Sequence, residues 1–405
     1  MTQATPVSTS ARPATRIASI DIIRGAVIVL MAIDHVRVYS GVPASGTTYG
    51  IFFTRWITHF CAPAFIFLAG TSAYFYGRTH AGLSRFLCVR GVWLILLELT
   101  VIRLAWTFNV DFNQYQLAGV IWVIGWCMIA LGVLSKLPTK AIAAFGIVVM
   151  AAHNLLDGHM QKLVPMLGDG AGAALWKLLY VGFWAGPIMF SPDGPVLFVL
   201  YSFIPWVGVM AAGYAFAHIL EMEPSRRNRA CLAIGLGAVA LFLVLRGFNL
   251  YGDPHPWAAA SPGPDGAPMP GLLSFLNTSK YPASLCFLLM TLGPTIALIP
   301  LLEKTTGGLA SALKVFGRVP FFFYVLHIPL IHALALVVSQ IRLGAVSPWL
   351  FANHPMAAGP PPEGYTWSLG LLYSVWALTV VLLYFACRWY RRFKMNRNAE
   401  LLRYL

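Results

Sequence analysis

Stretches of about 20 mostly apolar residues recur along the whole chain, and this feature constrains its fold most strongly. They lie roughly at 17–39, 56–76, 88–109, 117–135, 140–157, 195–219, 229–248, 283–302, 317–340 and 367–388. A helix of about 20 apolar residues can cross the hydrocarbon core of a bilayer. An eleventh stretch, 175–190, is interrupted by Lys177 and by Gly186-Pro187, which favours a re-entrant or interfacial segment. The sequence predicts an all-α polytopic membrane protein with ten, or eleven, transmembrane helices.

The composition excludes a soluble protein. Hydrophobic residues make up 58% of the chain and charged residues only 10%, with a mean hydropathy of +0.71. Soluble domains carry about 25% charged residues, so this chain has too few charges to cover a surface in water. Residues 1–16 are polar and no AxA-like cleavage site follows, so we interpret the first apolar run as an uncleaved helix. The six cysteines stand singly, without metal-binding spacing.

Lysine and arginine gather in alternate connections between the apolar runs. The rich connections include Arg78, Arg85 and Arg90, while the long connections 158–194, 249–282 and 341–366 are poorer in these residues. By the positive-inside rule, both termini are expected to be cytoplasmic. The predicted organisation is a cytoplasmic tail 1–16, a transmembrane domain 17–388 and a basic cytoplasmic tail 389–405. The net charge of +14 then reflects topology and gives no indication of nucleic-acid binding.

Several ionisable residues lie inside the predicted spans, where they are costly and often functional. The first helix carries the densest set. Its Arg24 and His35 are about three turns apart, which returns them to one face with a rise of roughly 16 Å. Asp21 can form a local ion pair with Arg24. The other such residues are Asp34, Arg37, His59, Glu98, Arg103, His327 and His332.

These groups are expected to surround a shared polar cavity, because they cannot all face lipid. We expect Glu98 and Arg103 each to pair with a charge on another helix, and His332 to be a packing residue. The sequence has no G-x-x-x-x-G-K-[ST] loop, no GxSxG motif and no pair of histidines four apart. With these motifs absent, the sequence favours a site in which a histidine acts as a base or acyl carrier and arginines hold a phosphorylated donor.

Six blocks of the sequence resemble a known family. They are RIASIDIIRGAVIVLMAIDHVRVYSG, HFCAPAFIFLAGTSA, ELTVIRLAWTFN, FIPWVGVMAAGYAFA, SKYPASLCFLLMTLG and FGRVPFFFYVLHIPLIH. Together, from Arg16 to His332, they resemble the bacterial heparan-alpha-glucosaminide N-acetyltransferase-like family. The first block also resembles the wider transmembrane acyltransferase superfamily, in which an arginine, ten residues and a histidine occur in the opening helix. Arg24 and His35 match that spacing.

The resemblance implies an acyltransferase of the bacterial inner membrane. It would move an acetyl or other acyl group from cytosolic acetyl-CoA or acyl-CoA to a sugar or glycan acceptor on the other side, without a metal. The lysosomal enzymes carry a histidine implicated in transfer in the loop after the first helix. Here that loop, Ser40 to Thr58, contains no histidine, which favours His35 over His59.

These considerations assign roles to eight residues. His35 is expected to be the base or acyl carrier, oriented by Asp34, with His327 as partner histidine and His59 as a further candidate. The residues expected to neutralise the CoA phosphates are Arg24, Arg85, Arg90 and Arg318.

Two other functions are open. In a transporter or flippase for a sugar or lipid-linked substrate, the same charges would form a relay or ligand site at mid-membrane. Against this, the charged pattern of the first helix has no counterpart in the second half of the chain. A membrane scaffold has no need of so many buried charges. Tryptophans and tyrosines of the outer loops would suit a sugar, but an interfacial aromatic belt gives the same composition. Acceptor identity and assembly as a homo-oligomer stay open.

Overall fold

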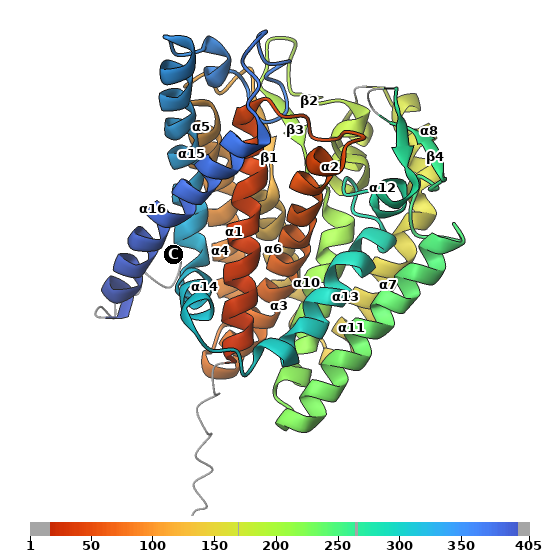
Figure 1. Cartoon of the computed structure of the whole chain (residues 1–405). Coiled ribbons are helices and arrows are strands. Elements are labelled where there is room, and N and C mark those ends of the chain that lie inside the picture. Colours follow the sequence, from red (N-terminus) through yellow and green to blue (C-terminus); the bar gives the residue numbers. More distant parts are fainter. Residues whose placement is uncertain (1–16, 169, 264–265, 396–405) are drawn as a thin grey trace, which may run out of the picture.

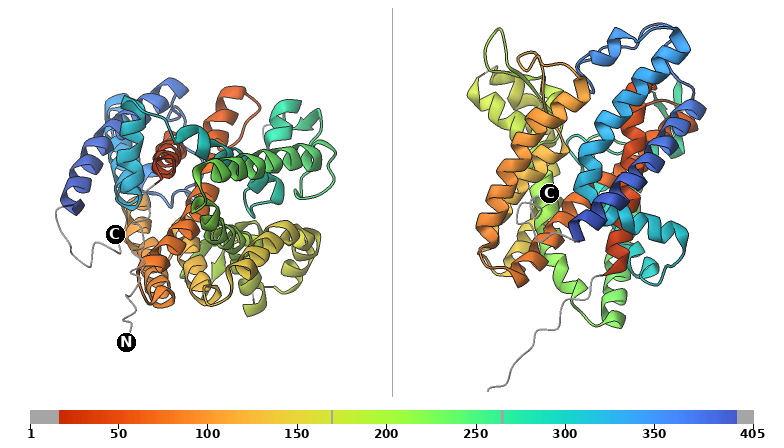
Figure 2. Two further views of the ribbon diagram at one scale, coloured as in Figure 1. Left: turned by 90° about the horizontal axis from the view of Figure 1, so that it is seen from below. Right: turned by 90° about the vertical axis from the view of Figure 1, so that its left-hand side faces the viewer.

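The computed structural model describes residues 17–168, 170–263 and 266–395. The predicted tail 1–16 lies outside the described residues, as do residues 396–405. Residues 389–395, which we assigned to the C-terminal tail, continue the last helix, α16 (Leu369–Met395). The chain forms an elongated helical bundle, seen from three directions in Figures 1 and 2. We call the end where α1 begins the lower end and the opposite end the upper end, as they appear in Figure 1.

Helices form in all the predicted apolar runs of the described chain. They are α1 (Ala18–Ser40), α3 (Cys61–Thr79), α4 (Leu83–Leu97) continued by η2 (Glu98–Ile102) and α5 (Arg103–Thr107), α6 (Val120–Leu134), α7 (Thr139–Ala152), α10 (Phe203–Leu220), α11 (Pro224–Gly247), α13 (Leu285–Leu302), α15 (Pro320–Leu343) and α16. Within the described ranges, seven helical segments are long and apolar enough to cross a membrane. The prediction of a mostly helical, multi-pass membrane protein is confirmed; the number of ten spans stays a prediction.

The connections at the upper end contain short helices and strands. The predicted eleventh run forms α9 (Ala171–Trp176), η4 (Lys177–Val181), η5 (Gly182–Ala185) and strand β2 (Ile188–Met189) rather than one helix. β3 (Val196–Val199) pairs in parallel with β1 (Gln116–Ala118) and antiparallel with β2. The remaining upper elements are α2 (Tyr49–Trp56), η1 (Ile57–Phe60), η3 (His153–Leu156), α8 (Asp157–Met166), the β4 (Ala260–Pro262) and β5 (Pro268–Pro270) hairpin, α12 (Gly271–Leu276) and η6 (Pro348–Phe351). These elements cover the upper end of the bundle (Figure 1).

Helix α1 occupies a central position. It packs against α3, α13, α14 (Gly308–Arg318), α15 and α16. Its mixture of apolar and charged residues follows from this position, because its polar side chains face protein and cavities rather than lipid. The charged residues of the predicted first span are therefore placed inside the bundle.

Glycines set the closest helix crossings. A Cβ added at Gly317 in α14 would lie 1.8 Å from the carbonyl oxygen of Asp21 in α1. One added at Gly25 in α1 would lie 2.0 Å from the carbonyl oxygen of Leu313 in α14. Glycines also occupy the crossings of α3 with α10, α4 with α6, α7 with α10 and α11 with α13. Small residues at membrane helix crossings let backbones approach closely, so these glycines determine how the helices are spaced.

We expect Gly317→Ala to destabilise the protein. The added methyl group overlaps the α1 backbone, which cannot move as a side chain can, and overpacking of this kind costs about 1–3 kcal/mol. Thermal unfolding of the purified protein in detergent should show a lower Tm. Gly237→Ala in α11 is the matched control, because its added Cβ meets nothing within 4 Å. Equal Tm values for the two variants would contradict the proposed role of the α1–α14 crossing.

Candidate active site

Two histidines from helices far apart in the sequence meet in the bundle. Nδ1 of His35 in α1 lies 2.6 Å from Nε2 of His327 in α15. Their rings stack, with centroids 4.8 Å apart and planes inclined by 24°. The ring of Trp106 contacts His35 edge-on, with centroids 4.9 Å apart. The structure thus brings together the two histidines that the sequence analysis placed in one site.

The hydrogen bonds around this pair determine where its protons lie when each ring holds one. Nδ1 of His327 is 2.5 Å from the main-chain oxygen of Tyr324, which can only accept, so Nδ1 of His327 carries the proton. Nε2 of His327 is then an acceptor, and Nδ1 of His35 donates to it. The remaining nitrogen of His35, Nε2, is therefore unprotonated. This arrangement gives His35 a free lone pair and a fixed orientation.

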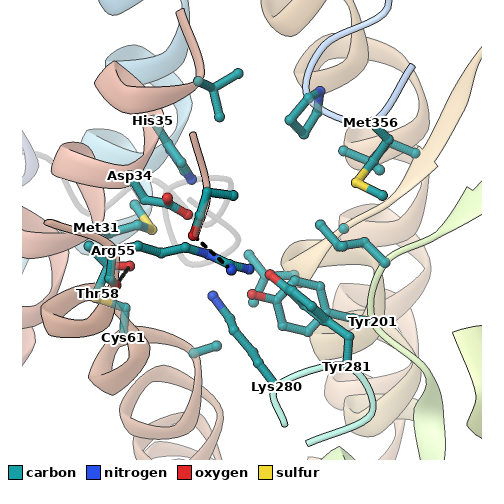
Figure 3. Close-up of a pocket in the computed structure, with 18 of the residues that line it drawn as sticks. Met31, Asp34, His35, Arg55, Thr58, Cys61, Tyr201, Lys280, Tyr281 and Met356 are labelled. Atoms are coloured by element: carbon teal, nitrogen blue, oxygen red, sulfur yellow. Dashed lines mark hydrogen bonds between the residues drawn. The ribbon is translucent and has the colours of Figure 1, made fainter. Parts of the chain in front are cut away.

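His35 lines a cavity of about 350 Å³ in the upper half of the bundle, the upper cavity. Figure 3 shows the His35 ring projecting into it. Its walls come from the elements α1, α2, η1, α3, η2, α5, β1, α6, η5 and α15, and from the loops before α2, α6, α10 and α13 and between α15 and α16. The lining includes Asp34, Arg55, Glu98 and Lys280 beside many aromatic side chains. Polar groups converging in a largely apolar cavity are typical of a ligand site.

Both carboxylates of the upper cavity have partners within the protein. Nε of Arg37 donates to Oδ1 of Asp34 at 2.7 Å. The main-chain N–H of Ile121, at the start of α6, donates to Oε2 of Glu98 at 3.1 Å. We expected Asp34 to orient His35, but in the described part of the chain no hydrogen bond joins the two side chains. The partner of Nδ1 of His35 is His327 instead.

A second cavity, the lower cavity, lies in the other half of the bundle and has a volume of about 810 Å³. Its walls come from α1, α3, α4, α6, α15 and α16 and are mostly apolar. Arg24, Arg90 and Lys394 bring positive charge to it, together with His80. Arg24 donates to the hydroxyl of Ser72 and, at 3.3 Å, to the carbonyl oxygen of Leu68. Cations around an apolar cavity suit a long ligand with an apolar arm and an anionic end.

The two cavities meet beside the histidine pair. Phe65, Val120 and Tyr324 line both of them. Tyr324 is also the residue whose main-chain oxygen accepts the hydrogen bond from His327. A ligand in the lower cavity and a ligand in the upper cavity would therefore approach each other close to His35.

The structure separates the four predicted arginines into two groups. Arg24 and Arg90 line the lower cavity, whereas Arg85 is exposed on α4 and does not line it. Arg318 also lies outside the lining, and its Nε is 3.4 Å from Oδ2 of Asp21. Arg85 and Arg90 differ by five positions on one helix, which turns them to different faces.

His59 is buried in η1 beside the upper cavity, between lining residues Thr58 and Cys61, but it is not itself part of the lining. Its ring contacts Phe287. Neither ring nitrogen has a hydrogen-bond partner in the described structure.

The prediction that Arg103 forms an ion pair with another helix is wrong for the described residues. Its guanidinium donates to main-chain oxygens of Tyr115, Asn109 and Asp111 instead. Oriented carbonyl oxygens compensate a buried cation without a second buried charge.

Sequence reasoning missed three cations of the two cavities: Arg55, Lys280 and Lys394. Arg55 stands alone in the apolar segment IFFTRWITHF, and Lys280 is a single lysine in a connection otherwise poor in lysine and arginine. Lys394 lies in the basic C-terminal run that we assigned to a tail. An isolated cation in an apolar or cation-poor segment is the signal that could have identified the first two.

The helices, with a histidine pair between two cavities, define a multi-pass membrane protein with a buried candidate site. Residues 16–250 match the family described as Heparan-alpha-glucosaminide N-acetyltransferase, catalytic. This match covers more than half of the chain, and the chain therefore belongs to this family of membrane acetyltransferases, as its sequence blocks predicted. The matched region contains His35, Arg24 and Arg90 but ends before Lys280 and His327. No curated protein matches the chain.

Proposed function

We propose that the protein transfers an acetyl group from acetyl-CoA in the lower cavity to a sugar or glycan acceptor in the upper cavity. The meeting of the two cavities beside the His35–His327 pair is the observation that carries this proposal. It gives each substrate its own compartment and places a base between them. Holding two reactants in one geometry converts a bimolecular step into an effectively unimolecular one.

The lower cavity suits the donor. Its apolar walls match the pantetheine arm, and Arg24, Arg90 and Lys394 offer charge-assisted hydrogen bonds to the CoA phosphates. Because Phe65, Val120 and Tyr324 belong to both cavities, the thioester end of the donor would lie at their junction.

In the proposed reaction, Nε2 of His35 accepts the proton of the acceptor amine or hydroxyl as its nitrogen or oxygen attacks the thioester carbon. The new C–N or C–O bond forms, the C–S bond breaks, and the sulfur leaves with the bonding electron pair. His35 then returns the proton to that sulfur, so free CoA thiol and acetylated acceptor are the products. His327 holds the ring of His35 and stabilises its positive charge while the proton is on it.

We further propose that the lower end faces the cytoplasm of a bacterium, in its inner membrane. Exposed cations lie at this end, with Arg78 in the last turn of α3, Arg85 in the first turn of α4 and Lys304 just after α13, as the positive-inside rule requires of the cytoplasmic side. The donor cavity would then open toward the cytosolic CoA pool.

The function can be tested with the purified full-length protein in nanodiscs. Acetyl-CoA and an amino sugar, supplied both as glucosamine and as glucosamine 6-phosphate, should yield free CoA thiol and N-acetylated sugar in equal amounts, measured by thiol titration and mass spectrometry. Proteoliposomes that take up sugar without consuming acyl-CoA, and that release no CoA thiol, would instead support a transporter and contradict the proposal.

Arg90→Gln is expected to raise the KM for acetyl-CoA about tenfold, because it removes one charge-assisted contact to the donor, worth about 1.4 kcal/mol. Arg85→Gln is the matched control on the same helix and should leave the KM unchanged, because Arg85 lies outside the lower cavity. Steady-state kinetics with varied acetyl-CoA provide the measurement. An equal response of the two variants would remove the lower cavity as the donor site.

A further inference from the structure

Lys280 is a buried cation whose amine faces the upper cavity. It lies in the connection between α12 and α13, is 9% exposed and lines the cavity. Figure 3 shows its amine pointing into the cavity space. In the described structure no ion pair or hydrogen bond engages this amine, which lies 5.2 Å from the centre of the Tyr281 ring. A buried ammonium group without a hydrogen-bond acceptor is unfavourable. The amine of Lys280 is therefore suited to bind an accepting group of a ligand in the cavity.

Arg55 contributes a second cation to the same cavity. It lies in α2, and its Nη1 donates to the carbonyl oxygen of Ala44 at 3.1 Å. No carboxylate pairs with it among the residues that the structure describes. The two carboxylates of the lining are already engaged, Asp34 by Arg37 and Glu98 by a main-chain N–H. The cavity therefore presents two cations that lack an anion.

The position of Lys280 is fixed by its neighbours in the chain. Oδ2 of Asp253 accepts hydrogen bonds from the main-chain nitrogen of Ser279 at 2.9 Å and the hydroxyl of Ser284 at 2.8 Å. Oδ1 of Asp253 lies 3.5 Å from the buried guanidinium of Arg246. Lys280 thus projects from a connection that is anchored on both sides, and its direction into the cavity is a feature of the fold.

Lys280 and Arg55 share the upper cavity with His35, since all three side chains line it. An anionic group held by these cations would therefore be bound within electrostatic reach of the proposed base. That location belongs to the acceptor side, because both cations line the upper cavity and neither lines the lower one.

We propose that Lys280 and Arg55 form an anion-binding subsite and that the acceptor is an anionic sugar, carrying a carboxylate or a phosphate. That the bound sugar is the acetyl acceptor rests on the proposed function. The binding of an anion by Lys280 and Arg55 does not depend on it. The bound anion supplies the missing partner of the two cations and positions the reacting amine or hydroxyl against His35. Both carboxylate and phosphate make charge-assisted hydrogen bonds of this kind.

Binding can be measured without acetyl-CoA, by isothermal titration calorimetry on the full-length protein in nanodiscs. Two matched pairs of probes separate the sources of the anion: glucuronate against glucose, and N-acetylglucosamine 6-phosphate against N-acetylglucosamine. We expect at least one anionic sugar to bind at least ten times more tightly than its neutral partner. The pair that shows the preference identifies the carboxylate or the phosphate as the recognised group.

Variants then assign the preference to the two cations. Lys280→Gln and Arg55→Gln should each reduce the affinity for the anionic probe about tenfold and leave the neutral probe unchanged. Lys280→Arg should retain the preference. Lys304→Gln is the control, because it removes an exposed positive charge away from the cavity.

Equal binding of anionic and neutral probes to the unchanged protein would overturn the subsite, and this result does not depend on any variant folding. An anion preference that survives in folded Lys280→Gln and Arg55→Gln would also overturn it. Failure of the proposed function looks different: anionic sugars would bind as predicted while no acetyl group is transferred to any acceptor.

Discussion

Replacement of His35 by alanine is expected to reduce acetyl transfer by about 10²–10⁴-fold, the range over which a positioned general base contributes. The variant removes the one unprotonated nitrogen that the histidine pair directs into the upper cavity. The affinity for acetyl-CoA should change little, because His35 does not line the lower cavity. The measurement is kcat with saturating acetyl-CoA and a fixed concentration of acceptor.

This prediction needs a protein that is still folded. The Tm of His35→Ala should lie within a few degrees of that of the unchanged protein. Its gel-filtration profile should show a single peak at the same position. His159→Ala is the control, because His159 is exposed in α8 and lines neither cavity. Full activity of folded His35→Ala would exclude His35 as the base.

Replacement of His327 by alanine is expected to lower kcat by about 10²-fold. Without Nε2 of His327, the Nδ1–H group of His35 has lost its acceptor, so the ring can rotate and its proton can move to the nitrogen that should act as the base. His327→Gln restores an acceptor oxygen and should recover part of the activity. This partial rescue distinguishes a positioning residue from one needed only for packing, since His327 is fully buried.

The double variant gives a second readout for the pair. If His327 acts through His35, the His35→Ala/His327→Ala protein should be about as active as His35→Ala alone, because residues that act as a unit are not additive. Losses of kcat that multiply in the double variant would indicate that the two histidines act independently.

The helices could be predicted from the sequence because hydropathy is a property of consecutive residues. Each predicted apolar run contains a helix, and the charges of 17–39 fall on α1. The eleventh run, 175–190, was harder to assign. It has the apolar composition of a helix but is broken at Gly182 and Gly186, both with positive φ, and it finishes in strand β2. Its pairing with β3 depends on a neighbour that local composition does not reveal.

The candidate site could be predicted only in part. The spacing of Arg24 and His35 predicted that they share one face of the first helix and one polar cavity. The structure instead places Arg24 in the lower cavity and His35 in the upper cavity. The same reasoning treated Arg85 and Arg90 alike, although Arg90 lines the lower cavity and Arg85 does not. It also left out Lys280, whose direction depends on hydrogen bonds to Asp253, 27 residues earlier in the chain.

By itself, the sequence determined that this protein is a helical membrane protein of the acetyltransferase family, with charges concentrated in its first helix. Hydropathy and motif spacing are properties of nearby residues in the chain, so they can be evaluated without knowledge of the fold. Only the tertiary structure decided that His35 meets His327 across 292 positions and that the two cavities join at Phe65, Val120 and Tyr324. The physical reason is that cavities are bounded by helices from the whole chain. Their separation is set by close crossings such as Gly317 against Asp21, which no local pattern specifies.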